Sequence, residues 1–114
     1  MLKLMKRAYL YFSDVFELLP YGFEELVEAW ERGPLCLFGL VRGRVERELG
    51  VIKGVRHYGT FLDLESMVFV VEYMVDYEGE GASGTVGVKI IYADNPQVAL
   101  MKYYEAEKKG KLIK

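Results

Sequence analysis

Apolar and polar residues alternate along two stretches in the C-terminal half of the chain, 68–77 and 86–92. The two stretches flank the Gly-rich segment GEGASG. Alternation with a period of two on both sides of a Gly-rich turn predicts a β-hairpin. The positions that share one face of it are Phe69, Val71, Tyr73, Val75 and Tyr77, followed by Val86, Val88, Ile90 and Tyr92.

A helical period marks residues 23–32. Its apolar positions fall at i, i+3, i+4 and i+7, namely Phe23, Leu26, Val27 and Trp30, and glutamates occupy much of the remaining surface. This pattern predicts an amphipathic helix that ends at Gly33-Pro34. A second helix is predicted over 95–110, because Asn95 suits the N-cap and Pro96 the first turn. We expect Leu100, Met101 and Tyr104 to form its core-facing stripe.

The first 22 residues have a less regular pattern. Leu2, Met5, Tyr9 and Phe12 fit a helical stripe, whereas Ala8, Leu10 and Phe12 fit one face of a strand. We prefer the helix. Asp14 and Glu17 have the spacing of a capping box, which predicts a further short helix before Pro20.

The segments 35–48 and 51–64 are predicted to be strands, joined by a turn at Leu49-Gly50. The first begins with the apolar run LCLFGLV and then alternates. Gly54 and Gly59 lie inside the second, where glycine often marks a bulge or bend. The apolar positions change parity between Val55 and Tyr58, as a bulge would require.

Together these elements predict a single α+β domain over residues 1–114. A helical flank at 1–33 precedes a four-stranded, strongly bent antiparallel sheet or half-barrel at 34–93, and a C-terminal helix follows at 95–110. Short turns between neighbouring strands require antiparallel pairing. The segregation of helices from strands is typical of α+β rather than α/β folds. The helices at the two ends would cover one open side of the sheet.

Composition narrows the class of protein. The chain is 52% hydrophobic, so it can form a core, yet no apolar run approaches the ~20 residues of a membrane span. Lys3, Lys6 and Arg7 interrupt the N-terminal apolar residues, which argues against a secretory leader. One cysteine, Cys36, allows no internal disulfide, so a reducing cytoplasm is expected. We expect Cys36 to be a small buried hydrophobe. The scarcity of Asn and Gln among many charges resembles thermophile composition.

No catalytic constellation stands out. His57 is the only histidine, and with Cys36 it cannot supply the four ligands of a zinc site, so no metal or cofactor is predicted. One enzyme-like arrangement remains open: His57, Asp63 and Glu65 could face a cavity beneath the helices, with His57 as general base. The alternative places them at an exposed bend and turn. Eight of the nine tyrosines, all except Tyr21, are expected at the edges of the core, with their hydroxyls in water.

Basic residues concentrate between positions 42 and 57, although the net charge is −2. On a strand pair, these basic side chains and two nearby aromatic residues would suit single-stranded nucleic acid; the residues are Arg42, Arg44, Arg47, Lys53, Arg56, Tyr58 and Phe61. The simpler interpretation is a solvated face whose arginines pair with neighbouring glutamates. The same basic face could also meet the acidic helix 23–32 of a second copy.

The C-terminal half resembles a family of small uncharacterised β-rich domains. Its members have a strand ending in Tyr-x-Val-Asp, a glycine turn, and a strand of the form Val-x-Val-x-Tyr-x-x-x-Asn-Pro. The resemblance spans roughly residues 38–100 and rests on Tyr73, Val75, Asp76, Val88, Ile90, Tyr92, Asn95 and Pro96. Members are often flanked by membrane helices, which this sequence does not contain. The resemblance implies a fold but no catalytic residues.

These observations favour a non-catalytic cytoplasmic module that binds a protein partner or itself. Two alternatives stay open: single-stranded nucleic-acid binding through the basic residues, and a small-molecule binder or enzyme with a cavity near His57.

Overall fold

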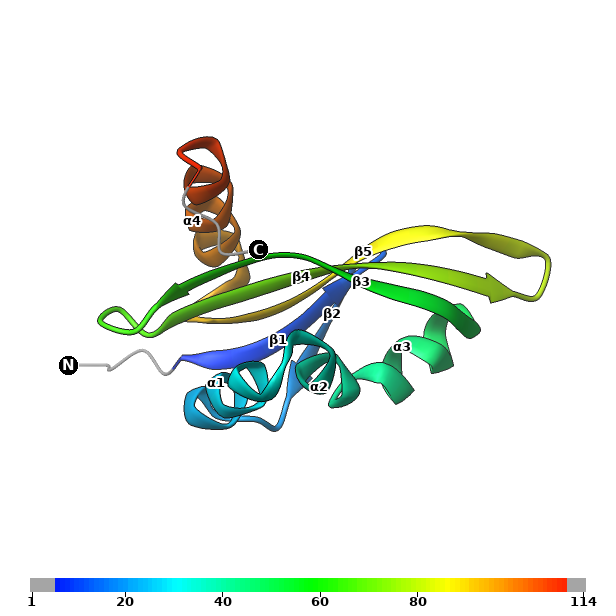
Figure 1. Ribbon diagram of the computed structural model, residues 1–114, viewed down its shortest axis with the longest axis horizontal. Coiled ribbons are helices and arrows are strands. Elements are labelled where there is room, and N and C mark those ends of the chain that lie inside the picture. Colours follow the sequence, from blue (N-terminus) through cyan, green and yellow to red (C-terminus); the bar gives the residue numbers. More distant parts are fainter. Residues whose placement is uncertain (1–5, 111–114) are drawn as a thin grey trace.

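The computed structural model describes residues 6–110. Along the chain it contains a hairpin, three helices, three long strands and a final helix (Figure 1). The elements are β1 (Arg7–Phe12), β2 (Val15–Leu19), α1 (Phe23–Arg32), α2 (Pro34–Gly39), α3 (Arg42–Leu49), β3 (Val51–Asp63), β4 (Val68–Gly79), β5 (Ala82–Ala93) and α4 (Pro96–Lys108).

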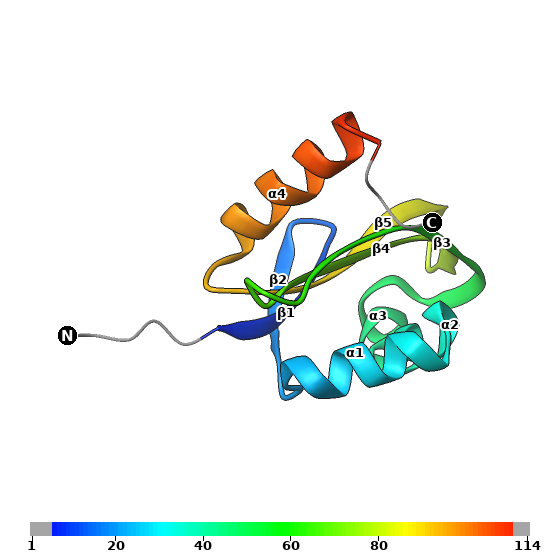
Figure 2. The same cartoon turned by 60° about the vertical axis from the view of Figure 1, so that its left-hand side comes forward.

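The strands form one five-stranded antiparallel sheet in the order β2-β1-β5-β4-β3. The sheet is open, with β2 and β3 at its edges, so the predicted four-stranded half-barrel is wrong. Helices α1, α2 and α3 lie on one face and α4 on the other (Figure 2). The sheet is therefore the middle layer of three, whereas the sequence had suggested helices over a single open side.

The two helices predicted before Pro20 are replaced by the hairpin of β1 and β2. Ala8, Leu10 and Phe12 alternate into the core, which is the strand pattern that we had ranked second. The turn residues Ser13 and Asp14 have φ angles of 47° and 65°. Two successive positive φ angles are the geometry of the tight turns that match the twist of a hairpin, and aspartate tolerates them. Asp14 is therefore a turn residue and no helix cap; residues 1–5 lie outside the described residues.

The segment 35–48 is helical, so its predicted strand is also wrong. Pro34 occupies the first turn of α2, where its missing N–H costs nothing. Leu37, Val41 and Val45 recur at intervals of four and are buried against the sheet. An apolar run alone does not distinguish a buried strand from a buried helix, and positions four apart share one face in both. Cys36, expected to be buried, lies on the exposed side of α2.

Other predictions are confirmed. The β4–β5 hairpin, α1, and the N-cap of α4 all form, and the Asn95 side chain accepts a hydrogen bond of 2.9 Å from the Val98 amide. The pairing of β3 with β4 shifts register between Ile52 and Gly54 and again between His57 and Gly59. Both shifts fall at the glycines that predicted bulges.

Each face of the sheet has its own core. The larger one joins β1, β4 and β5 to α1, α2 and α3, with Leu26, Phe38 and Tyr73 among its fully buried side chains. The smaller one lies beneath α4 and contains Val68, Val70, Ile91, Ala93, Ala99 and Tyr103. These two cores share only the strands between them.

Candidate interaction surface

Helix α4 carries apolar side chains on both of its sides. Ala99, Tyr103 and Ala106 face the sheet and are buried. On the opposite side, 42% of Val98, 68% of Met101 and 54% of Tyr104 are exposed. The predicted core stripe, which included Met101 and Tyr104, is therefore wrong. Of that stripe, only Leu100 packs against the small core.

A polar network fixes α4 to the sheet. Glu72 of β4 and Lys89 of β5 are directly opposite each other in the ladder and form an ion pair with Nζ and Oε2 3.1 Å apart. The two side chains are about one-tenth exposed. The Tyr103 hydroxyl donates a 2.7 Å hydrogen bond to the other Glu72 oxygen. The helix is thus held by a specific, charge-assisted contact as well as by its small apolar face.

Two neighbours complete this network. The Lys89 ammonium lies 5.5 Å from the centre of the Tyr11 ring, within range of a cation–π interaction. A side chain at Gly87 would come within 2.9 Å of the Glu72 carboxylate, so glycine leaves room for the ion pair. Burial, and next the hydrogen bond to Glu72, raise the pKa of Tyr103 far above its ordinary value. Tyr103 therefore stays a neutral donor across the physiological range.

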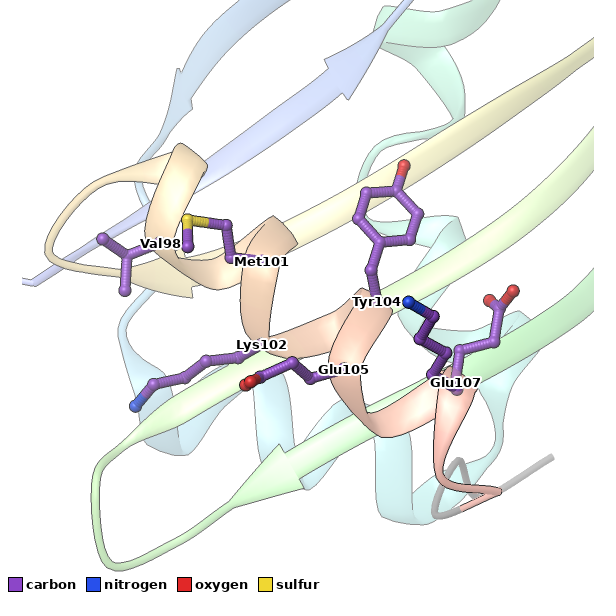
Figure 3. Close-up of a pocket in the computed structure, with 7 residues that line it drawn as sticks. Val98, Met101, Lys102, Tyr104, Glu105 and Glu107 are labelled. Atoms are coloured by element: carbon purple, nitrogen blue, oxygen red, sulfur yellow. The ribbon is translucent and has the colours of Figure 1, made fainter.

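The outward side of α4 combines its apolar stripe with charges of both signs. Figure 3 shows Val98, Met101 and Tyr104 projecting from the helix. Lys102, Glu105, Glu107 and Lys108 join them in lining one surface hollow. We call Val98, Met101 and Tyr104 the outer stripe. Methionine and tyrosine are among the side chains enriched at protein interfaces.

A second apolar patch lies on the same face of the sheet. Phe16 and Leu18 of β2 are exposed, and the Phe16 ring stacks on Tyr11 with centroids 4.3 Å apart. Tyr11 in turn packs against the small core beneath α4, as does Leu100. Apolar surface therefore extends from the edge strand toward the helix.

His57 lies on the other side of the sheet, toward the larger core. Its Nε2 is 2.7 Å from the Thr60 hydroxyl, and the Trp30 indole donates a 3.0 Å hydrogen bond to the same oxygen. The His57 ring also lies 6.0 Å from the ring of Tyr73. Burial lowers the pKa of His57, and a hydrogen bond to the Gly59 backbone partly opposes that shift. This arrangement links β3 to α1, and the lowered pKa favours the neutral form of the imidazole.

The structure does not bring His57, Asp63 and Glu65 together. Asp63 is six residues further along β3, and it caps the turn to β4 by accepting a 3.2 Å hydrogen bond from the Ser66 amide. Hydrogen bonds from Ser66 lower the pKa of Asp63. Glu65 is exposed in the same turn. A shallow hollow does adjoin Asp63, but it lies between β3 and α4, on the face opposite His57.

The basic residues are divided between two elements. Arg42, Arg44 and Arg47 lie on α3, while Lys53, Arg56, Tyr58 and Phe61 lie on β3. No strand face unites them, because 42–49 is helical, so the predicted basic strand pair is wrong. Four are paired with carboxylates: Arg42 with Glu46 at 3.0 Å, Arg44 with Glu17 at 3.1 Å, Lys53 with Glu78 at 3.5 Å, and Arg56 with Asp76 at 3.3 Å.

Sequence reasoning missed the network of Glu72, Lys89 and Tyr103. A signal was present, because the β4–β5 turn fixes the register of the hairpin. With Gly79 opposite Ala82, counting back places Glu72 opposite Lys89. Of the tyrosines that we expected at the edge of the core, Tyr73 and Tyr103 are instead fully buried.

The fold and surface define an α+β domain whose central antiparallel sheet carries helices on both faces. Comparisons with protein-family models, curated proteins and solved structures found no match. No helix within residues 6–110 is long and apolar enough to cross a membrane. In the same range, no group of three or more His, Cys, Asp or Glu residues is placed to hold a metal ion.

Proposed function

We propose that the protein is a non-catalytic interaction module that binds a polypeptide through the outer stripe of α4. The exposure of Val98, Met101 and Tyr104 on a helix already packed by its opposite side carries this proposal. A helix that is apolar on both sides is usually covered on both. The fitting partner presents apolar side chains flanked by charges of both signs, which complement Lys102 and Glu105 beside the stripe.

The ion pairs weigh against the nucleic-acid alternative. A groove for single strands needs basic side chains available to phosphates, whereas Arg42, Arg44, Lys53 and Arg56 each already have a carboxylate partner. A labelled oligonucleotide at about 50 mM salt provides the direct check, since such binding is strongest at low salt. Salt-sensitive binding there would favour that alternative over ours.

Sedimentation velocity and affinity capture test the proposal. We expect either self-association or capture of a protein, and we expect Met101→Glu to abolish it. Leu35→Glu is the matched control, because Leu35 is 60% exposed on α2, which lies on the opposite face of the sheet from α4 (Figure 2). A protein that binds nothing, or whose binding is equally sensitive to both changes, would contradict a role for the outer stripe.

A further inference from the structure

The outer stripe has a geometry that a second copy of the same helix can match. Resting on the proposed function, we propose that the partner is this chain itself, with two α4 helices packed antiparallel about a two-fold axis at Met101. Val98 and Tyr104 each lie three residues from Met101, about 4.5 Å along the helix. In the antiparallel arrangement Val98 of one copy therefore faces Tyr104 of the other, so that a small side chain meets a large one.

Charge along α4 favours the antiparallel orientation. Asp94 precedes the N-cap, and Lys108 is the last helical residue. Lys102, Lys108 and Lys109 outnumber Glu105 and Glu107 in the second half, whereas the first half holds no charge besides Asp94 at its start. The antiparallel arrangement brings Asp94 of each copy to the Lys108 end of the other and opposes the two helix dipoles. A parallel arrangement would bring like charges together.

The position of α4 allows this contact. The helix is the outermost element on its face of the sheet (Figures 1 and 2). The network of Glu72, Lys89 and Tyr103 holds it in one place, so little ordering is required on association. Its 13 residues span about 20 Å. A contact of that length is smaller than a standard interface, so we expect a dimer that forms at micromolar concentrations or above.

Engineered cysteines test the orientation directly. Exposed Cys36 is first replaced by serine so that it cannot form disulfides of its own. Under mild oxidation, Met101→Cys should cross-link to itself. Val98→Cys and Tyr104→Cys should each stay largely uncross-linked alone, yet form a heterodimer when mixed. Efficient 98–98 and 104–104 cross-links would indicate a parallel pair and overturn the inference.

Charge reversal supplies an independent readout. Asp94→Lys and Lys108→Asp should each weaken the dimer, on the order of fivefold, because exposed ion pairs contribute little individually. The double variant should restore the affinity, since the pair is re-formed with its signs exchanged. Circular dichroism checks that α4 stays folded in all three proteins. Failure of the double variant to recover, with α4 intact, would contradict the Asp94–Lys108 contact.

The outcomes separate this inference from the proposed function. A dimer that is lost in Met101→Glu and cross-links between 98 and 104 supports both. A monomer that captures another protein, and loses that capture in Met101→Glu but not in Leu35→Glu, overturns the inference and leaves the proposed function standing. A strict monomer that captures nothing through α4 overturns both. If Met101→Glu also lowers the melting temperature of such a monomer, the stripe is covered by the chain itself.

Discussion

The two faces of the sheet are covered in different ways. On one face, three helices bury a continuous apolar core, and the Tyr73 hydroxyl donates to the Pro34 carbonyl at its margin. On the other face, a single helix covers a small core, and its Tyr103 hydroxyl reaches a buried ion pair. The first face is held mainly by buried area and the second by a specific polar contact. A helix held in that way can present an apolar outer side without being buried itself.

Of the changes that test this difference, disrupting the Glu72–Lys89 ion pair should lower the free energy of unfolding the most. Lys89→Met leaves the Glu72 carboxylate buried without its partner, and we expect a loss of about 3 kcal/mol in the free energy of unfolding. Denaturant titration measures it. The double variant Glu72→Gln/Lys89→Met keeps an acceptor for Tyr103 and should recover most of the loss. If the single variant costs less than ~0.5 kcal/mol, the pair does not hold α4.

Truncating either of two adjacent valines of β4 compares how tightly the two cores are packed. Val70 points toward α4 and Val71 toward α1, α2 and α3, and both are fully buried. Truncating Val71 to alanine should cost about 2–3 kcal/mol, from lost burial plus the cavity left behind. Val70→Ala should cost less, because a single helix can settle into the space. Equal losses in unfolding titrations would show that the two faces are equally rigid.

Removing one hydroxyl from α4 is a smaller change. Tyr103→Phe keeps the ring and deletes the donor to Glu72, so we expect a loss of about 1.5 kcal/mol, typical of a hydrogen bond to a charged group. Hydrogen exchange should show the loss concentrated in α4 amides. Tyr9→Phe, on β1, serves as the control for loss of a tyrosine hydroxyl. Uniform faster exchange across the whole sheet would contradict a local role.

The smallest expected effect is the pH dependence that His57 gives to the free energy of unfolding. Because burial lowers its folded-state pKa below the ordinary value of about 6.5, protonation favours the unfolded chain. Stability should therefore be complete above pH 6.5 and decline as the pH falls through 6.5 toward the folded-state pKa. The difference between the wild type and His57→Gln, measured by denaturant titration at several pH values, isolates this contribution. A difference that does not change with pH would show that His57 titrates normally.

The sequence predicted the elements whose patterns are strong. Alternation identified the β4–β5 hairpin, the period of 3.6 identified α1, and Gly54 and Gly59 marked both bulges. It failed where local patterns are ambiguous. The run LCLFGLV fits a strand or a buried helix, and 7–12 could be assigned only once β1 had β5 as its neighbour. Pairing across some 80 residues is not encoded in a local window.

The interaction surface was harder to predict for a related reason. The composition of α4 indicates a helix, but Ala99, Tyr103 and Ala106 are a weaker apolar stripe than Leu100, Met101 and Tyr104. The large tyrosine and small alanines fit closely over β4 and β5, so shape decided which side faces the sheet. Met101 and Tyr104 of the more apolar stripe were left outside, and that inversion only a structure could reveal.

The bulges of β3 have a consequence for the size of any assembly. An edge strand with two register shifts, bearing Lys53 and Arg56, is a poor template for the addition of another strand. The opposite edge, β2, has only five residues. Open-ended growth by adding strands is thus disfavoured at both edges of the sheet. A two-fold contact through α4 buries the same surface on both copies and leaves none of it for a third. The proposed pairing of two α4 helices would therefore stop at two copies.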